Sequence, residues 1–401
     1  EHLHKENVPN LRFPEFSGEW EKTTIGKCCG NLEYGMNAAA KTFDGVNKYI
    51  RITDIDEDTS SYIQSDIVSP DARLEEKYRV TINDILFART GASTGKTYLY
   101  RPDDGKLYFA GFLIRANVKE NYNSRFVFLQ TKTSSYKRWV AIMSTRSGQP
   151  GINSQEYSSY SFKAPTLKEQ NKIADIFRLL DERIATQIKI IEDLKKLKSA
   201  ISKRVFAQKD LLETTICLSD IATLKNGYAF QSSKYNPLGK WKILTIANVS
   251  GERYINNEDC NCIINLPSDI QNHQVLKEGD ILISLTGNVG RVSLCKAGDY
   301  LLNQRVGLLQ FTNNANREFI YQVLSSRRFE NSMIACGQGA AQMNIGKGDV
   351  ENYVLPYSTN ANNIHLVAKI LQSYDEKIIN EQRRLSLLTI QKQYLLSQMF
   401  I

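Results

Sequence analysis

The sequence predicts an α+β fold built twice, with two similar mixed domains joined by two long antiparallel helices that form a coiled-coil-like spacer. Two segments with helical apolar periodicity, residues 167–206 and 362–400, superpose when Phe206 is placed on Phe400. Motifs upstream of the two segments repeat at nearly the same offset. The residues between them have the branched and aromatic composition of short strands. These three observations predict the fold class.

Composition and charge set the class of protein. The 401 residues are 42% hydrophobic, 10% aromatic and 23% charged, which excludes a disordered or collagen-like chain. No apolar run is long enough to cross a bilayer, residues 1–9 lack a signal-peptide pattern, and the seven cysteines have no framework spacing. We therefore expect a cytoplasmic protein with reduced thiols and no membrane association. Its net charge of +8 permits a polyanionic partner.

The internal repeat extends beyond the helical periodicity. Residues 180–184 fall on 374–378, and both copies contain an Asp-Glu-basic-Ile step. The Asp-Ile-Leu…Thr-Gly pattern of residues 84–91 recurs in 280–287. Further matches align Gly148, Asn153 and Pro165 with Gly339, Asn344 and Pro356. The chain is therefore predicted to be a tandem of two units, each a globular region followed by a long helix.

Each globular region is predicted to be a mixed α+β domain. The strands are assigned to segments between Gly, Asn and Asp turns, namely 48–55, 85–87, 97–100, 107–114 and 281–285. One helix is expected over residues 124–143, and its counterpart over 317–335. The predicted boundaries are an N-terminal arm (1–19), a first domain (20–165), a central helical spacer (166–209), a second domain (210–358) and a C-terminal helical spacer (359–401).

The two long helices are predicted to pack on each other along an apolar stripe. The first has a start signal, because Thr166 and Glu169 fit a capping box. The packing residues recur mostly at spacings of three and four: Ile173, Phe177, Leu180, Ile184, Ile188, Ile191, Leu194, Ile201, Ile370, Tyr374, Ile378, Leu385, Leu388 and Leu395. Mutual burial requires antiparallel helices, each about 60 Å long at most. Gln382 and Gln391 interrupt the second stripe, and a simple linker or a dimerisation stalk is the alternative.

The candidate catalytic patterns fail on spacing. The turn Gly91…Gly95-Lys96 is one residue short of a phosphate loop, and Gln342 stands where a dinucleotide loop has its last glycine. Cys260 and Cys262 lack a second ligand pair at zinc spacing, and the four histidines are scattered. The chain is therefore predicted to be non-catalytic, with no metal site and no cofactor of its own.

Nucleic-acid-binding residues are predicted in polar loops of both halves. Asn, Gln, Arg and Lys side chains read base edges, whereas Ser, Thr and backbone amides hold phosphates. The candidates are Arg89, Thr90, Ser93, Lys96, Thr145, Arg146, Ser147 and Gln149 in the first domain, and Thr286, Asn288, Arg291, Gln338, Gln342 and Asn344 in the second. Basic pairs such as Arg327-Arg328 are suited to following a phosphate backbone.

The order of these motifs matches a family pattern. Residues 9–16 read Pro-Asn-Leu-Arg-Phe-Pro-Glu-Phe, Trp20 follows, and both halves contain the Asp-Ile-Leu…Thr-Gly step. The first long helix begins with Pro165…Glu169-Gln170…Ile173, whereas the second start, residues 356–364, lacks the Glu-Gln pair and is three residues longer. With these motifs the chain resembles, over essentially its whole length, the specificity subunit of type I restriction–modification systems.

The resemblance implies two target recognition domains, each reading one half of a bipartite double-stranded DNA sequence, with the helices setting the gap. It also implies two adenine methyltransferase subunits docked on the helices, with endonuclease/translocase subunits added. S-adenosylmethionine, ATP and magnesium would belong to those partners. We expect residues 90–96 and 145–149 at one half-site, and 286–291 and 338–344 at a different one. Two alternatives stay open: a stand-alone two-headed DNA-binding regulator, and a nuclease with an unrecognised site.

Overall fold

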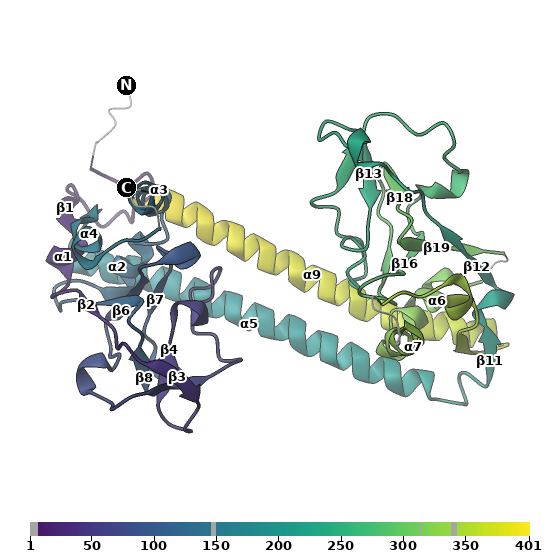
Figure 1. Cartoon of the computed structure of the whole chain (residues 1–401), viewed down its shortest axis with the longest axis horizontal. Helices are drawn as coiled ribbons and strands as arrows, with labels where there is room; N and C mark the ends of the chain where they lie inside the picture. Colours follow the sequence, from purple (N-terminus) through teal and green to yellow (C-terminus); the bar gives the residue numbers. More distant parts are fainter. Residues whose placement is uncertain (1–6, 146–149, 313–314, 338–342) are drawn as a thin grey trace. The chain divides into compact units, whose positions relative to one another are not determined.

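The computed structural model describes residues 7–145, 150–312, 315–337 and 343–401 (Figure 1). The chain divides into two compact units: unit 1 comprises Glu1–Thr186 and Leu385–Ile401, and unit 2 comprises Gln187–Arg384. Each unit combines an α+β domain with a stretch of both long helices, α5 (Leu167–Phe206) and α9 (Ala361–Met399). The α+β class and both long helices are confirmed, and α9 starts and ends one residue before its predicted range.

A four-stranded antiparallel sheet in the order β2–β9–β6–β7 forms the centre of unit 1. Its strand β6 is fully buried, and Ile85 pairs with Ala116 of β9 on one side and Leu99 of β7 on the other. Two-stranded ladders pair β1 with β10, β3 with β5, and β4 with β8, the last one parallel. The strands are β1 (Glu21–Thr24), β2 (Glu33–Tyr34), β3 (Ala39–Thr42), β4 (Lys48–Ile50), β5 (Val68–Asp71), β6 (Asp84–Ala88), β7 (Thr97–Leu99), β8 (Leu107–Phe109), β9 (Leu113–Asn117) and β10 (Ser161–Ala164).

Unit 2 repeats this construction. The sheet β12–β19–β16–β17 corresponds to the central sheet of unit 1, and a second sheet has the order β14–β13–β18–β15. Strands β13 and β18 are parallel, as β4 and β8 are in unit 1. The strands are β11 (Thr214–Cys217), β12 (Ala222–Asn226), β13 (Trp241–Leu244), β14 (Asn261–Ile263), β15 (Val275–Leu276), β16 (Ile281–Ser284), β17 (Val292–Leu294), β18 (Tyr300–Leu302), β19 (Val306–Phe311) and β20 (Val354–Tyr357).

Two predicted strands differ in the structure: one is shortened and the other is divided. The segment 48–55 leaves the extended conformation after β4, because the Asp54 carboxylate accepts the Arg51 backbone N–H at 2.8 Å and closes a 3₁₀ turn. The segment 107–114 turns between β8 and β9, where Leu113 N donates to Ala110 O at 2.8 Å. The chain thereby passes from the parallel ladder with β4 into the central sheet.

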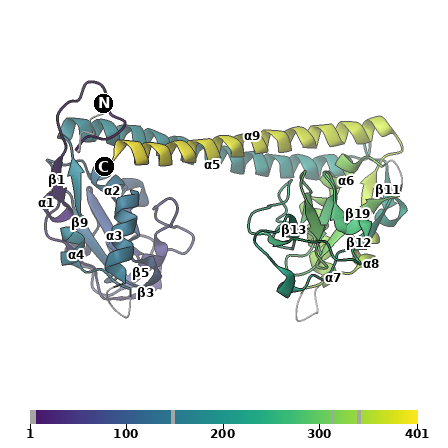
Figure 2. The same ribbon diagram turned by 90° about the horizontal axis from the view of Figure 1, so that it is seen from above.

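Each single helix predicted beside the sheets is a pair of helices. In unit 1 the pair is α2 (Ser124–Gln130) and α3 (Ser134–Ser144), and Figure 2 shows α2 between the long helices and α3. The break occurs because the Thr133 hydroxyl donates to Gln130 O and also accepts the N–H of Tyr136, which ends one helix and caps the next. The other short helices are α1 (Ile25–Cys28), α4 (Ser154–Ser159), α6 (Arg317–Leu324), α7 (Arg327–Gly337) and α8 (Lys347–Glu351).

Within each unit the long-helix segments run antiparallel and are joined by an equivalent ion pair. In unit 1 Lys392 of α9 lies 2.7 Å from Asp181 of α5. In unit 2 Lys198 of α5 lies 2.6 Å from Asp375 of α9. Both pairs consist of the same two repeat positions with the helices exchanged. In the described part of the chain, no helix has the length and hydropathy needed to span a bilayer.

The predicted packing stripe is buried to different degrees along its length. Ile173, Phe177, Ile191 and Ile378 are buried. The intermediate positions are Leu180, Ile184, Leu194, Ile201, Ile370, Tyr374, Leu385, Leu388 and Leu395. Ile188 is 37% exposed, so its assignment to the stripe is wrong. The neighbouring Gln187 is buried instead, because its side-chain amide binds Glu381 of the opposite helix.

The N-terminal segment is joined to the start of α5. Arg12 binds both carboxylate oxygens of Glu169 at 2.7–2.8 Å, and Glu169 is only 1% exposed. Glu169 therefore ion-pairs with Arg12, and the expectation that it completes a capping box with Thr166 is corrected. Gln170 donates to Pro165 O at 2.8 Å and accepts Asn123 N at 3.0 Å. The Glu-Gln pair thus connects α5 to the N-terminal segment and to the start of α2.

Candidate nucleic-acid interface

In unit 1, the turn after β6 is fastened to the segment before α4. Gly91 N donates to Pro150 O at 3.0 Å, Ile152 N donates to Arg89 O at 2.9 Å, and Thr90 forms a bridge with Gly151. Gly91 has φ +68°, a conformation that side chains other than glycine rarely adopt. Of the two segments predicted to lie near one half-site, 90–96 is therefore joined to residues 150–152, which directly follow the second segment, 145–149, along the chain.

Buried groups hydrogen-bond to the same turn and pack against it. The Tyr157 hydroxyl donates to Ala88 O at 2.7 Å and accepts Gly95 N at 3.1 Å, and burial raises the pKa of Tyr157, so the hydroxyl keeps its proton. Gly95 has φ +89°, and a Cβ there would lie 2.5 Å from Val140 Cγ1. The turn between Thr90 and Lys96 is therefore a rigid platform rather than a phosphate loop.

The other candidates of unit 1 surround this platform. Ser93 is half-buried, and Lys96 Nζ lies 3.1 Å from Glu57 Oε2, so this cation has a carboxylate partner. Thr145 is exposed at the C-cap of α3, where its hydroxyl donates to Ile142 O at 2.9 Å. Arg146, Ser147 and Gln149 lie outside the described residues.

Unit 2 builds the same platform. Gly287 N donates to Met343 O at 3.0 Å, Ile345 N donates to Leu285 O at 2.9 Å, and Thr286 forms a bridge with Asn344. Gly287 again has φ +68°. The hydrogen-bond pattern thus repeats that of unit 1 bond for bond.

The candidates of unit 2 differ in their surroundings. Asn288 and Asn344 are exposed, whereas Arg291 Nε lies 3.7 Å from Glu330 Oε1. The Thr286 hydroxyl is buried and has no hydrogen-bond partner among the described residues, so it does not face solvent. Gln338 and Gln342 lie outside the described residues.

These bridges also correct the repeat alignment downstream of the sheets. Ile345 occupies the place of Ile152, and in the edge ladders Tyr357 occupies the place of Ala164. Asn344 therefore corresponds to Gly151 and not to Asn153. The counterpart of Pro165 is Ser358 and not Pro356. The sequence alignment of the two halves was two residues out of register here, because the Gly-rich loops before these segments differ in composition.

The aromatic neighbours of the predicted residue Arg89, beside the unit 1 platform, were missed. The Arg89 guanidinium lies 4.8 Å from the centroid of the Tyr34 ring, whose hydroxyl accepts Ser154 N at 3.2 Å. Arg89 N donates to Phe112 O at 3.1 Å, and the Phe112 side chain is 59% exposed. No carboxylate forms an ion pair with Arg89 in the described part of the chain. Tyr34 and Phe112 belong to β2 and to the β8–β9 turn, so only the tertiary fold brings them to Arg89.

The corresponding positions of unit 2 carry different side chains. Leu285 N donates to Arg305 O at 3.0 Å, so Arg305 stands where Phe112 stands in unit 1. Leu285 stands where Arg89 stands, and it is buried. The sequence itself identifies Arg89 and Leu285 as equivalent positions, because each directly precedes the shared Thr-Gly step. The two units therefore share the hydrogen bonds that hold the Thr-Gly turn, with different side chains around it.

Comparisons with known proteins agree with this duplicated architecture. The sequence model of the family "Type I restriction modification DNA specificity domain" matches twice, over residues 18–196 and 213–389. The type I restriction enzyme MjaVIII specificity subunit of Methanocaldococcus jannaschii is 26% identical over 80% of this chain and 78% of its own length. The putative MjaX specificity subunit of the same organism is 24% identical over 93% of this chain and 91% of its own length.

Solved structures show the same fold. The S subunit of the type I restriction–modification system from M. genitalium superposes with a TM-score of 0.60 at 18% identity, over 98% of this chain and 99% of that subunit. A chain from a structural study of complex assembly and conformational transition of the type I R-M system superposes with a TM-score of 0.56 at 15% identity, over 94% and 96%.

Proposed function

This chain belongs to the type I restriction–modification DNA specificity family, and we propose that it directs partner subunits to a bipartite DNA sequence, each unit reading one half. The observation that carries the proposal is the duplicated platform. Gly91 and Gly287 share the same φ of +68°, and equivalent bridges fasten both turns. The side chains around the turns differ, which is what recognition of two unlike half-sites requires.

The side chains beside the two turns suit base reading. Arg89 and Arg305 each present a planar fork of N–H donors, the group that pairs bidentately with guanine in the major groove. Phe112 offers an apolar edge for a thymine methyl group, and Asn288 can pair with adenine. Thr90, Ser93 and the backbone amides of the turn suit phosphate oxygens, which position the protein without reading sequence.

The long helices supply the surface for partner subunits in this proposal. Exposed apolar side chains on the helix segments of unit 1 include Leu179 at 56%, Leu387 at 65% and Ile390 at 61%. The segments of unit 2 expose Leu197 and Leu366, both at 47%. Such side chains favour docking of apolar partner surfaces. We assign one adenine methyltransferase subunit to each unit, with endonuclease/translocase subunits added to these.

Chemistry belongs to the partners in the same proposal. The methyltransferase subunits would bring S-adenosylmethionine, and the endonuclease/translocase subunits ATP and magnesium. This chain would act in the cytoplasm as a non-catalytic subunit that selects the DNA site. The support is the family membership together with the failure of each candidate catalytic motif on spacing.

Methylome sequencing of cells with and without this chain tests the proposal. We expect one bipartite adenine-methylated motif that disappears when the chain is deleted and returns with it. Tight binding of the motif by the purified chain without any methyltransferase, and no change in methylation, would instead indicate a stand-alone regulator. Metal-dependent cleavage of DNA by the purified chain would indicate a nuclease.

A further inference from the structure

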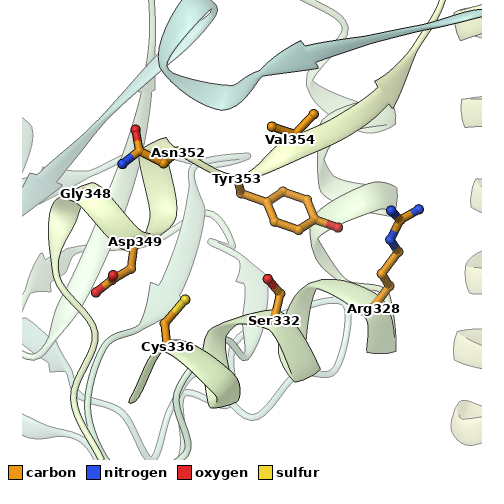
Figure 3. Close-up of a pocket in the computed structure, with 8 residues that line it drawn as sticks. All are labelled: Arg328, Ser332, Cys336, Gly348, Asp349, Asn352, Tyr353 and Val354. Atoms are coloured by element: carbon orange, nitrogen blue, oxygen red, sulfur yellow. The ribbon is translucent and has the colours of Figure 1, made fainter. Parts of the chain in front are cut away.

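Unit 2 contains a surface hollow beside α7. Its volume is about 390 Å³, and it is lined by α7, α8 and the residues leading into β20 (Figure 3). Arg328 and Ser332 come from α7, and Asn352 and Tyr353 precede β20. Figure 3 shows the Tyr353 ring across one side of the hollow, with its hydroxyl toward Arg328 and the Ser332 side chain below it.

The internal repeat identifies what occupies this place in unit 1. Tyr136 of α3 and Tyr160 form an edge-to-face ring pair with centroids 5.1 Å apart. Phe329 of α7 and Tyr353 form the same kind of pair at 4.9 Å. Matching the two ring pairs aligns α3 with α7 and places Tyr353 in the position of Tyr160. Residue 332 then takes the position of residue 139.

The residue at this position is tryptophan in unit 1 and serine in unit 2. The Trp139 ring lies 5.0 Å from Tyr160 and 5.9 Å from Tyr157, so an indole covers the tyrosine. In unit 2, Ser332 leaves the corresponding face of Tyr353 uncovered. The hollow therefore has a wall that, in the other half of the same chain, packs against a flat bicyclic ring.

Polar groups without partners line the hollow. The Tyr353 residue is only 8% exposed, yet its buried hydroxyl has no hydrogen-bond partner among the described residues. A buried hydroxyl without a partner is destabilising unless a bound molecule or water satisfies it. Arg328 is exposed at the rim, and no ion pair involves it in the described part of the chain. An indole offers no acceptor to either group, and its single N–H could meet the Tyr353 hydroxyl only as a donor.

We propose that this hollow binds a purine nucleotide, with the purine ring in the place that the Trp139 indole takes in unit 1. A purine is a flat bicycle of indole size, and its ring nitrogens accept the hydrogen bond that the Tyr353 hydroxyl has to donate. Its aromatic face or edge packs on the tyrosine ring. The Arg328 guanidinium at the rim binds the phosphate. The site lies within unit 2 alone and is independent of how the chain reads DNA.

The test measures ligand-dependent thermal stability of the purified full chain. The probes are AMP, adenosine and a 5′-phosphorylated single-stranded tetradeoxyadenylate, because the same purine and phosphate occur in free nucleotides and in DNA strands. At ten times its Kd a ligand should raise the Tm of the binding unit by about 3–6 °C. Stabilisation by AMP assigns the site to free nucleotides, and stabilisation by the oligonucleotide alone assigns it to a strand.

Variants copied from the other unit provide the controls. Ser332→Trp fills the hollow with the side chain of unit 1, so it should abolish the ligand-dependent shift while the protein still unfolds cooperatively. Arg328→Ala should make AMP no better than adenosine. Tyr353→Phe should weaken purine binding at least several-fold and leave the fold intact. Failure of all three probes to stabilise the wild-type chain up to 10 mM (about ten times a millimolar Kd), or an equal shift in the Ser332→Trp chain, would overturn the proposal.

Discussion

Gln187 of α5 and Glu381 of α9 occupy equivalent positions of the internal repeat, 194 residues apart, and hydrogen-bond to each other. Gln187 Nε2 donates to Glu381 Oε2 at 2.7 Å and to the Glu381 carbonyl at 3.1 Å. Both residues are 3% exposed. A contact between equivalent positions is isologous, and a polar pair in an otherwise apolar seam fixes the register of two helices.

Gln187→Leu tests this contact. The substitution removes a buried hydrogen bond to a carboxylate and should lower the free energy of unfolding by about 1–3 kcal/mol. Ile188→Ala on the neighbouring exposed position is the matched control and should change it by less than about 0.5 kcal/mol. Urea denaturation followed by circular dichroism gives both values. Equal effects of the two substitutions would show that the pair does not hold the helices.

The same carboxylate should contribute a pH dependence. Hydrogen bonds from Lys377 and Gln187 lower the pKa of Glu381 to about 2, below its ordinary value of 4.5. A carboxylate with a depressed pKa in the folded state stabilises the fold above its unfolded pKa and loses that contribution as it is protonated. Stability should therefore fall from about pH 4.5 to pH 2 more steeply in the wild type than in Glu381→Gln. If the free energy of unfolding falls equally in the two proteins between pH 5 and pH 2, the Glu381 carboxylate does not contribute this pH dependence.

Lys132 should make the free energy of unfolding depend on pH in the neutral to alkaline range. Its Nζ donates to Ser60 Oγ and Thr97 Oγ1, both at 2.6 Å, and burial lowers the pKa of Lys132 from 10.5 to about 7. Between these values the unfolded chain binds a proton that the folded chain does not, so the free energy of unfolding should rise with pH from 7 to 10.5. We expect a rise of about 2–4 kcal/mol that Lys132→Met removes. A difference between the two proteins that does not change across this range would contradict the assignment.

Arg12→Ala should destabilise unit 1. The substitution leaves the Glu169 carboxylate buried without its partner, which typically costs about 3–5 kcal/mol. The double substitution Arg12→Ala/Glu169→Gln should recover part of the loss, because the buried charge is removed as well. Limited proteolysis and thermal unfolding report both changes. If the double variant is no more stable than the single one, the ion pair does not explain the position of the N-terminal segment.

The architecture could be predicted because the repeat and the helical periodicity are sequence-local signals. The range of α5 follows from apolar spacing, and β6 follows from the Asp-Ile-Leu step. The breaks between α2 and α3 and at Arg51–Asp54 were missed. In these places a single Thr133 or Asp54 side chain captures backbone groups and overrides the propensity of the segment.

The candidate site was predictable only in part. The Thr-Gly turns stand out in the sequence, and the structure joins the turn of unit 2 to its predicted companion segment through Asn344. The turn of unit 1 is joined to Gly151, which lies just beyond the predicted segment 145–149. Tyr34 and Phe112 could not be found, because non-local strand pairing brings them to Arg89. Ile188 was assigned to the seam because its apolar side chain fits the spacing, although the polar Gln187 is the buried residue.

The most direct test of two-site recognition compares Arg89→Ala with Arg305→Ala in the full chain assembled with its methyltransferase. Methylation of a library of duplexes carrying every base at each half-site position is measured by sequencing. Each substitution should relax selectivity at a guanine in one half-site by about 5- to 150-fold, corresponding to about 1–3 kcal/mol, and leave the other half-site unchanged. The account would be contradicted if one substitution relaxed base selectivity at both half-sites. It would also be contradicted if neither substitution relaxed selectivity at either half-site.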